Sequence, residues 1–496
     1  MTAGELLEGS GLRGEVPAAL AGRTVRGLAY DSRKAGEDFL FFAFPGARTD
    51  GRVFAAEAVE KGALAVISEL ESPEAFPGTW LRTEHGRRTL ATAAARFYGH
   101  PDRRLHLTGI TGTNGKTTTA YLADSIFRRA GRTTALIGTI EYRLAERVLP
   151  AVNTTPESLD LFELFQQLEQ AGGSHATLEV SSHALALGRV YGIRFDTAVF
   201  TNLTRDHLDF HRTMEEYFAA KQQLFLGEGT EAPRVAVLNA DDEWGRQIRT
   251  KSGTEVLWYG LEEGAAARAV RITSGFEGLR FEIQFQGRSY RVESRLAGRI
   301  NVCNILAAWC AAFADGIPPE VIAEGIATLE AVPGRFERVD EGQPFLVIVD
   351  YAHTDDALRN TIAVARTLTK KRVITLFGCG GDRDRSKRPL MGMAAAQDSD
   401  YVVLTSDNPR SEDPLTIIND TLVGLRRYDT PHSIEPDRAK AIRKAIEQAS
   451  SGDVVIVAGK GHETYQVLRD TVIAFDDREV ARRTLRAFGY RREEQT

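Results

Sequence analysis

The stretch "LTGITGTNGKTTT" (residues 107–119) decides the fold of the middle of the chain. An apolar run enters a loop with Gly112 and Gly115, and the following "TTTAYLADSIFRRAG" has helical spacing that ends at Gly131. Strand, glycine loop and helix in this order are typical of a phosphate-binding loop. The common G-x-x-x-x-G-K-[ST] pattern has glycine where this chain has Ile110, so "GTNGKTT" predicts a shorter loop with the same parts.

The side chains of this loop have the chemistry of a nucleotide site. Lys116 supplies a positive charge to the outer phosphates, and the hydroxyl of Thr117 or Thr118 can ligate Mg²⁺. The alternative is a glycine turn with a solvated lysine, which the flanking strand and helix disfavour. We expect ATP to bind the loop residues Gly112, Thr113, Asn114, Gly115, Lys116, Thr117 and Thr118.

The length of 496 residues predicts roughly three domains, at about 150 residues each. Residues 1–100 read as a small α/β domain, and 101–333 as a central doubly wound sheet around the phosphate loop, with further strands "TAVFTNL" and "RVAVLNA". Residues 334–496 read as a Rossmann-like domain. Its strands "FLVIVDYAH", "RVITLFGCGG", "YVVLTSDNPR" and "DVVIVAGKGHE" each break into a polar loop, where ligands of open α/β sheets bind.

Composition excludes several classes of protein. Hydrophobic residues make up 43% and charged residues 26%, which is typical of a globular chain. A net charge of −6 gives no general attraction for nucleic acid or anionic membranes. The three cysteines make no C-x-x-C pair and indicate neither a disulfide framework nor a zinc site. With no signal peptide at the start and no apolar run near the ~20 residues of a membrane span, we expect a cytoplasmic monomer.

"GTNGKTT" resembles the ATP loop of the Mur ligases, which build the peptide of bacterial cell-wall precursors. The segments "TLEVSSHALALGRV", "TNLTRDHLDFH" and "YFAAKQQLF" are similar to companion motifs of that family. The resemblance implies that Glu179, His207 and the Thr117 hydroxyl bind Mg²⁺, and that Lys221 is carbamylated and completes the metal site. A neutral lysine amine that captures CO₂ becomes an anion, which Mg²⁺ stabilises. With Lys116, these are the expected catalytic residues; taken singly, a helix lysine is usually a surface charge.

The binding site of the acceptor, the substrate to which an amino acid is added, is inferred from "YDSR", "GARTDG", "NTTPE" and the serines after Glu179. By resemblance, the first domain binds the uridine diphosphate sugar of UDP-MurNAc-L-Ala-D-Glu. Leu187 stands where some relatives have glutamine, and "NTTP" alone is typical of a turn or a helix cap. The residues expected to hold this substrate are Tyr30, Ser32, Ala47, Arg48, Thr49, Asn153, Thr154, Thr155, Ser181 and Arg189.

Further nucleotide contacts are implied by "AGRINVCN", "VPGRFE" and "DYAHTDDAL". The matching residues are Asn301, Asn304, Arg335, Asp350 and His353. Asp355 replaces the proline that usually follows "DYAHT".

The last domain decides which amino acid is added. Arginines, carboxylates and an amide at strand ends suit a ligand with ammonium and carboxylate groups, although a surface salt-bridge cluster has the same composition. "DNPR" resembles the loop of the Mur ligases that add 2,6-diaminopimelate, whereas lysine-adding relatives typically lack the arginine. The expected contacts are Arg383, Asp407, Asn408, Pro409, Arg410, Gly459 and Glu463.

The resemblance therefore implies an ATP-dependent ligase that activates the D-glutamyl γ-carboxylate as an acyl phosphate and joins it to diaminopimelate, releasing ADP and phosphate in peptidoglycan precursor synthesis. A lysine-adding Mur ligase and folylpolyglutamate synthase, which shares this kind of ATP loop, are the alternative ligases. A nucleotide-gated switch is the alternative of a different class.

Overall fold

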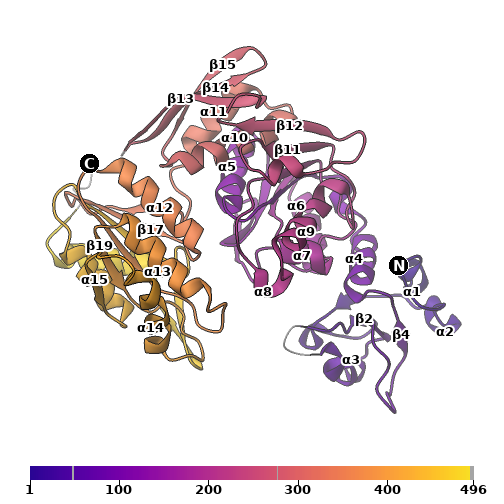
Figure 1. The fold of residues 1–496 in the computed structure, drawn as a ribbon. Coiled ribbons are helices and arrows are strands. Elements are labelled where there is room, and N and C mark those ends of the chain that lie inside the picture. Colours follow the sequence, from indigo (N-terminus) through magenta and orange to yellow (C-terminus); the bar gives the residue numbers. More distant parts are fainter. Residues whose placement is uncertain (47–49, 276, 492–496) are drawn as a thin grey trace.

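The computed structural model describes residues 1–46, 50–275 and 277–491. Three large β-sheets of four, eleven and six strands follow one another along the chain, each covered by helices (Figure 1), and a two-stranded sheet over residues 465–474 lies in the last part. This confirms the predicted α/β class with a three-part organisation. The boundaries at residues 100 and 333 stay predictions, and Ala47, Arg48 and Thr49 lie outside the described residues. Within the described ranges, none of the helices is long and apolar enough to span a bilayer.

The first sheet is parallel, in the order β1-β2-β3-β4. Its strands are short and apolar, and Leu40 and Ile67 join a buried cluster that continues through Leu90 of α4 to Phe162 and Phe165 of α6. The first domain therefore shares its core with one face of the central sheet. The elements are α1 (Ala3–Leu7), α2 (Ala18–Ala21), β1 (Gly27–Ala29), β2 (Phe39–Phe42), α3 (Ala55–Glu60), β3 (Ala65–Ser68), β4 (Trp80–Arg82) and α4 (Gly86–Phe97).

The central sheet has the order β15-β14-β13-β12-β11-β10-β5-β9-β6-β7-β8, parallel from β13 to β6 and antiparallel at both edges. The elements are β5 (His106–Thr111), α5 (Lys116–Arg129), β6 (Thr134–Ile137), β7 (Glu141–Leu144), β8 (Arg147–Pro150), α6 (Ser158–Gln170), β9 (His175–Glu179), α7 (Ser182–Leu187), β10 (Thr197–Phe200), α8 (Leu208–His211), α9 (Met214–Leu226), β11 (Val235–Asn239), β12 (Glu255–Gly260), β13 (Ala267–Gly275), β14 (Gly278–Phe285), β15 (Arg288–Ser294), α10 (Arg299–Ala314) and α11 (Pro319–Thr328).

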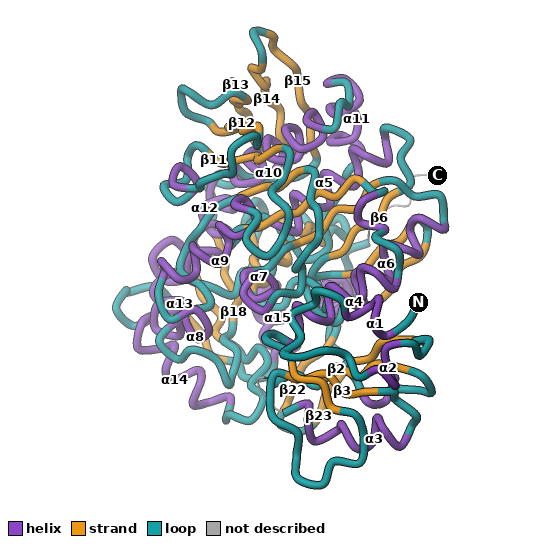
Figure 2. Tube along the Cα trace, turned by 90° about the vertical axis from the view of Figure 1, so that its right-hand side faces the viewer, coloured by secondary structure: helices purple, strands orange, loops and turns teal. Residues whose placement is uncertain are grey.

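Helices cover both faces of this sheet, as a doubly wound sheet requires. Helices α5, α10 and α11 pack in one buried cluster, while α6, α7 and α9 contribute to the cluster on the other face (Figure 2). Strand β5 is buried inside the sheet, with β10 on one side and β9 on the other. The loop that follows β5 therefore starts at the middle of the sheet.

The last sheet has the order β16-β17-β21-β18-β19-β20, and all its pairs except β16–β17 are parallel. Its own two clusters form its core, so it packs as a separate body. The elements are β16 (Glu337–Val339), β17 (Leu346–Asp350), α12 (Asp355–Leu368), β18 (Val373–Phe377), α13 (Lys387–Asp398), β19 (Tyr401–Leu404), α14 (Pro414–Leu425), β20 (His432–Ile434), α15 (Arg438–Glu447), β21 (Val454–Ala458), β22 (Tyr465–Leu468), β23 (Thr471–Ala474) and α16 (Asp477–Ala487).

Asp355 fits its position for a simple reason. It is the first residue of α12, and the Thr354 hydroxyl caps this helix by accepting a hydrogen bond from Ala357 N at 3.2 Å. Proline is favoured at this first position, but a carboxylate there also interacts well with the helix dipole. Asp355 in addition pairs with Arg359 at 2.9 Å, so the helix begins normally without proline.

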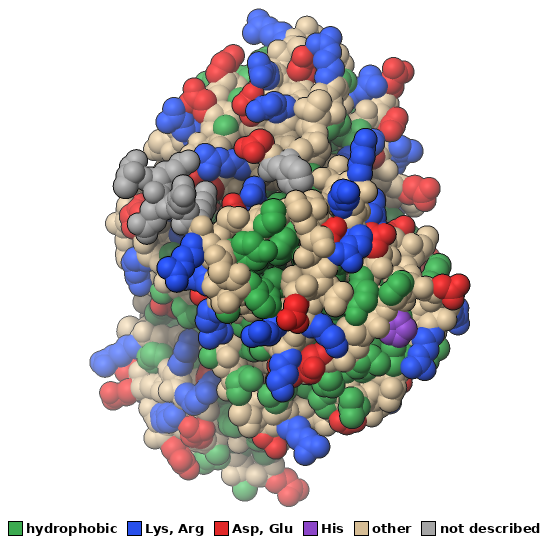
Figure 3. Space-filling model, turned by 90° about the vertical axis from the view of Figure 1, so that its left-hand side faces the viewer, with side chains coloured by type: hydrophobic (Ala, Val, Ile, Leu, Met, Phe, Trp, Pro, Cys, Tyr) green, Lys and Arg blue, Asp and Glu red, His purple; other side chains and the backbone are tan. Residues whose placement is uncertain are grey.

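The surface carries mixed charge. On the face shown in Figure 3, basic and acidic side chains are interspersed, and hydrophobic side chains gather near its centre. This face therefore has no large area of a single sign, which agrees with the small net charge of −6.

Candidate active site

The glycines of the phosphate loop sit where larger residues would not fit. Gly115 has a φ of 88°, and a Cβ there would overlap Oδ1 of Asn304 on α10. Gly112 has a φ of 146°, and a Cβ there would overlap Oγ1 of Thr201. Close packing of backbone against neighbours on two sides therefore explains both glycines. The loop connects β5 to the N-terminus of α5, which confirms the predicted strand, loop and helix.

Two lysines converge on one carbonyl oxygen of this loop. Lys116 Nζ donates to the carbonyl oxygens of Gly112 and Thr113, each at 2.9 Å. Lys221 Nζ, from α9, donates to the same Gly112 oxygen at 2.9 Å and lies 4.6 Å from the ring centre of Tyr217. Lys221 is only 1% exposed. Burial, and then the charge of Lys116, hold the pKa of Lys221 well below its usual range, so its neutral amine is favoured.

Glu179, at the end of β9, lies beside the start of α5. Its carboxylate accepts hydrogen bonds from Thr117 Oγ1 at 3.0 Å, Thr139 N at 2.9 Å and Thr139 Oγ1 at 2.9 Å. Arg335 donates to Thr117 Oγ1 at 3.2 Å. The buried carboxylate and the adjacent hydroxyl are hard oxygen donors, which suit Mg²⁺.

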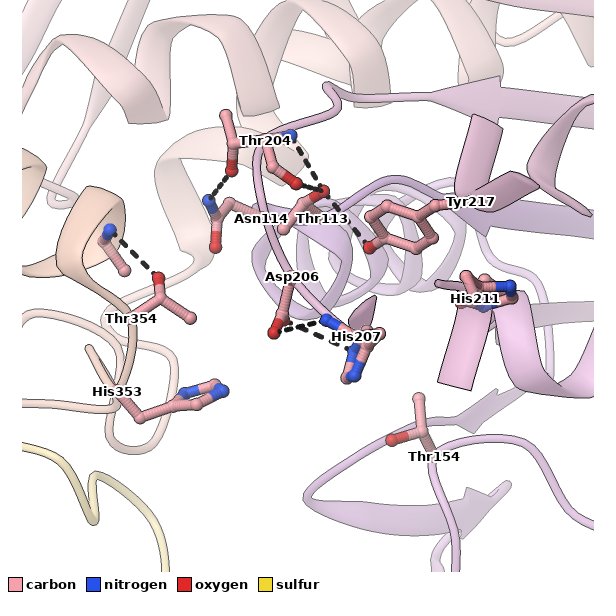
Figure 4. Close-up of polar contacts among 12 residues, drawn as sticks. Thr113, Asn114, Thr154, Thr204, Asp206, His207, His211, Tyr217, His353 and Thr354 are labelled. Carbon is pink, nitrogen blue, oxygen red and sulfur yellow. Dashed lines mark hydrogen bonds and ion pairs between the residues drawn. The ribbon is translucent and has the colours of Figure 1, made fainter. Parts of the chain in front are cut away.

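His207 lies next to a link between domains. It has a left-handed backbone (φ 53°) at the start of α8, and its Nε2 lies 3.3 Å from Asp206 Oδ2. Burial lowers the pKa of His207 to about 3, so the imidazole is neutral and can act as a ligand. Asp206 in turn pairs with Lys387 of α13 at 2.6 Å. Figure 4 shows Asp206 paired with His207, and His353 facing them from the last domain.

Polar contacts hold the phosphate loop from several directions (Figure 4). Thr113 Oγ1 lies 3.2 Å from Tyr217 OH and accepts a hydrogen bond from Thr204 N at 3.0 Å. Asn114 Nδ2 donates to Asp356 Oδ2 at 3.1 Å, which brings α12 of the last domain against the loop. The loop therefore lies at the junction of the central and last domains.

Of the other expected nucleotide residues, Asn304 and Arg335 contact the phosphate loop, and Asn301 contacts Asn304. Asn304 packs against Gly115, and its Nδ2 donates a hydrogen bond to Asn301 Oδ1 at 2.9 Å. Arg335 contacts Thr117. Asp350 is instead engaged within its own domain, since it accepts from Phe336 N at 2.6 Å and from a threonine hydroxyl. The His353 side chain is exposed, on the domain junction.

Several side chains expected to bind the acceptor form hydrogen bonds or ion pairs within the protein. Tyr30 OH donates to Asp160 Oδ2 at 2.5 Å, and Ser32 Oγ donates to Glu57 Oε2 at 2.8 Å. Arg189 lies 3.0 Å from Glu157 Oε1, which also pairs with Arg87 at 3.3 Å. These side chains have protein partners that a bound ligand must share or replace.

The "NTTP" segment forms bends between β8 and α6, close to Glu179. Asn153 is exposed, and Thr154 Oγ1 lies 3.2 Å from Thr139 Oγ1. The Thr155 side chain is fully buried, and its hydroxyl donates to the Glu179 carbonyl oxygen at 2.8 Å. Ser181 caps α7 by accepting from Ala184 N at 3.2 Å.

The two expected arginines of the amino-acid site lie on either side of Gly380. A Cβ at Gly380 would be 3.0 Å from Arg410 NH1 and 3.8 Å from Arg383 Cγ. Arg410 has a φ of 53°, and its NH1 donates to the Gly381 carbonyl oxygen at 2.7 Å. Arg383 is exposed. Gly380 thus lies beside the Arg410 guanidinium and the aliphatic stem of Arg383.

A buried lysine that sequence reasoning missed organises the other half of this site. Lys460 is fully buried, and its Nζ donates to Glu463 Oε2 at 2.8 Å and to Asn408 Oδ1 at 3.2 Å. Asn408 Nδ2 also donates to Glu463 Oε2, at 2.9 Å. A Cβ at Gly459 would lie 2.6 Å from Asp407 Oδ2, and the Pro409 carbonyl packs on Gly381. The sequence feature that could have identified Lys460 is a lysine inside "GKGHE", directly after a buried strand.

Three family descriptions match the chain in order. "Mur ligase family, catalytic domain" matches residues 24–98, "Mur ligase middle domain" matches 110–312, and "Mur ligase, glutamate ligase domain" matches 334–461. Together with the glycine loop and the three sheets, these matches define the class of protein: the chain belongs to the Mur ligase family.

Individual relatives of the chain have more specific names than the family descriptions. The chain is 64% identical over 490 residues to UDP-N-acetylmuramoyl-L-alanyl-D-glutamate–2,6-diaminopimelate ligase of Solibacter usitatus, covering 99% of each chain. It is 48% identical over 459 residues to the protein of the same name from Geobacillus thermodenitrificans, covering 92% of this chain and 94% of that one.

Solved structures agree. A structure of UDP-N-acetylmuramoyl-L-alanyl-D-glutamate–2,6-diaminopimelate ligase matches with a TM-score of 0.71 and 33% identity, over 99% of both chains. Folylpolyglutamate synthase from Mycobacterium tuberculosis, complexed with ADP and AMPPCP, matches with a TM-score of 0.61 over 75% of this chain and 92% of that one. At 18% identity, that second likeness concerns the fold alone.

Proposed function

We propose that this chain is an ATP-dependent ligase that joins 2,6-diaminopimelate to the D-glutamyl γ-carboxylate of UDP-MurNAc-L-Ala-D-Glu. The observation that carries the proposal is the 64% identity over 99% of both chains to a ligase named for these substrates. The Arg410 guanidinium beside Gly380 supports the choice of diaminopimelate, because a guanidinium group can bind the second carboxylate that lysine lacks.

The donors near the phosphate loop fit a magnesium ion. Glu179, Thr117, the neutral imidazole of His207 and a carbamate on Lys221 would hold it, and the ion would neutralise charge on the transferring phosphoryl group. Carbamylation of Lys221 is supported by its buried, neutral-favouring amine, whose acceptor is a backbone carbonyl and not a carboxylate. Adding CO₂ to this amine releases one proton and creates the anion.

Activation uses the loop. The γ-carboxylate of the acceptor attacks the ATP γ-phosphorus, the bond to the β-phosphate oxygen breaks, and an acyl phosphate and ADP result. Lys116 must leave the carbonyl oxygens of Gly112 and Thr113 to reach the phosphates, which offer its charge a stronger partner. The contacts of Asn304 with Gly115 and of Arg335 with Thr117 support the proposal that they position the nucleotide, with Asn301 bound to Asn304.

Amide formation uses the last domain. The neutral amine of diaminopimelate attacks the acyl carbon, phosphate leaves, and the amine loses a proton. Arg383 and Arg410 hold a carboxylate of diaminopimelate. Glu463 and Asp407 face the ammonium group at the end of diaminopimelate that does not react. Contacts such as Asp206–Lys387 close the junction and help keep water from the acyl phosphate. We place this monomeric enzyme in the cytoplasm, where ATP is available.

The test is a product analysis. Purified protein, ATP, Mg²⁺ and UDP-MurNAc-L-Ala-D-Glu are incubated with diaminopimelate or with lysine, and the uridine product is weighed by mass spectrometry. We expect a tripeptide containing diaminopimelate and one phosphate per amide. A lysine product would favour the lysine-adding alternative, and ADP formation without any amide bond would reject the ligase. Lys116→Ala is the inactive control.

A further inference from the structure

A second cluster of possible metal ligands lies at the other end of the central sheet. His106 is the first residue of β5 and His175 the first residue of β9, and the two are direct partners in the parallel pair. Asp315 follows the last residue of α10. The phosphate loop begins after Thr111, and a strand rises about 3.3 Å per residue, so the cluster is roughly 17 Å or more from that loop.

The donor atoms converge. Asp315 Oδ2 lies 2.7 Å from His175 Nε2, and Asp315 Oδ1 lies 3.0 Å from His106 Nδ1. One ligand atom from each of the three residues lies within 4.8 Å of the others. Ligands of a tetrahedral zinc ion at about 2.0–2.1 Å are separated by roughly 3.4 Å, so small side-chain rotations bring all three to bonding distance.

The surroundings suit ligation. The His175 and Asp315 side chains are 8% and 9% exposed, and His106 is 18% exposed. His175 Nδ1 lies 2.8 Å from Ser174 Oγ, the kind of outer partner that orients a ligating imidazole. His106 faces Asp315 with Nδ1, and its Nε2 is buried without a hydrogen-bond partner among the described residues.

We propose that His106, His175 and Asp315 form a second metal site, which binds a divalent transition-metal ion, Zn²⁺ above all. Two imidazoles and one carboxylate are borderline ligands that favour Zn²⁺ over Mg²⁺ or Ca²⁺, which take oxygen donors. Three protein ligands leave a fourth position to water. The bound ion fastens the end of α10 to β5 and β9, and the other end of α10 carries Asn304 against the phosphate loop.

The test measures metal binding directly. Full-length protein without a histidine tag is stripped with a chelator, returned to buffer with excess Mg²⁺, and titrated with Zn²⁺ by calorimetry and with Co²⁺ by visible absorption. Because Zn²⁺ can also enter the catalytic pocket, the titration is repeated with His207→Asn. We expect one equivalent of Zn²⁺ to remain in that variant, with a raised melting temperature and a d–d spectrum of low-coordinate Co²⁺.

Two variants keep the hydrogen bonds but remove the ligands. His106→Asn and His175→Gln place an amide N–H near the original ring nitrogen, so the fold is retained. Each should weaken Zn²⁺ binding by more than about 100-fold, since loss of even an outer partner costs about 10- to 100-fold. His432→Gln, on β20 of the last domain, is the matched control and should bind as the unchanged protein does. Absence of the second equivalent, or equal affinity in His175→Gln and the unchanged protein, overturns the proposal.

Discussion

Replacing Arg410 by alanine should remove the preference for diaminopimelate over lysine. The backbone of Arg410 is held independently of its side chain, since its N donates to Val467 O at 3.1 Å and its carbonyl accepts from Arg469 N at 2.8 Å. Alanine would meet the same φ of 53° as arginine does. The substitution therefore removes the guanidinium group and its contact with Gly381 while leaving the loop in place.

The size of the effect follows from the position of the side chain. Truncating one member of a buried hydrogen-bonded charge pair costs about 2–5 kcal/mol, and the half-buried Arg410 belongs at the lower end, about 2–3 kcal/mol. Since each 1.4 kcal/mol is tenfold, kcat/KM for diaminopimelate should fall about 30- to 150-fold. The value for lysine, which has no second carboxylate, should change little.

The assay is amino-acid-dependent phosphate release with each amino acid at several concentrations. Arg410→Lys should be intermediate, because it keeps the charge but loses the planar fork. Arg427→Ala, an exposed arginine whose NH1 lies 3.8 Å from a methionine sulfur, is the matched control. The reasoning is refuted if Arg410→Ala lowers kcat/KM equally for both amino acids, or if its discrimination matches that of the control.

Three further predictions concern the phosphate loop, Lys221 on α9 and His462 in the last domain. Lys221→Ala should lose activity at least about 100-fold, as removal of a metal ligand does, and formate or acetate should restore part of it by replacing the carbamate; intact mass of the unchanged protein should show one added CO₂. Gly115→Ala should abolish ATP binding in calorimetry, because its Cβ would displace Asn304 and the left-handed φ disfavours alanine, whereas Gly253→Ala, also at positive φ but in open space, should bind ATP normally. Burial lowers the pKa of His462 from 6.5 to about 3, so between these pH values the histidine binds a proton in the unfolded chain but not in the folded one. The contribution of His462 to the free energy of unfolding is therefore complete above pH 6.5 and is lost as the pH falls toward 3. His462→Gln should flatten that decline in urea unfolding midpoints, and an unchanged pH slope would contradict the assignment.

The phosphate loop and the sheets could be predicted because their signals are local. Gly112, Gly115 and Lys116 stand in a short pattern between a buried strand and an amphipathic helix, and the apolar runs of the last domain end in polar loops. Glu179 was likewise expected at a strand end, which is where the structure places it. Such predictions need only residue type and spacing along a short segment.

The rest depends on pairings that spacing does not encode. Lys221 and Gly112 are 109 residues apart, and Asp206 and Lys387 are 181 apart. The buried role of Lys460 and the inward hydroxyl of Thr155 follow from packing of loops from different strands. These contacts form only when the whole sheet is assembled, so a local sequence pattern does not predict them.

The buried cluster that runs from the first domain into the central sheet has a consequence for substrate length. Leu40 and Leu90 pack in the same core as Phe162 and Phe165, so the first two domains form a common body. If the uridine end of the acceptor binds the first domain and its carboxylate lies beside Lys116, the protein fixes the distance between these two ends. The acceptor must then have the matching length. An acceptor one residue shorter or longer would place its carboxylate away from the phosphate, and length alone would then decide which precursor is extended.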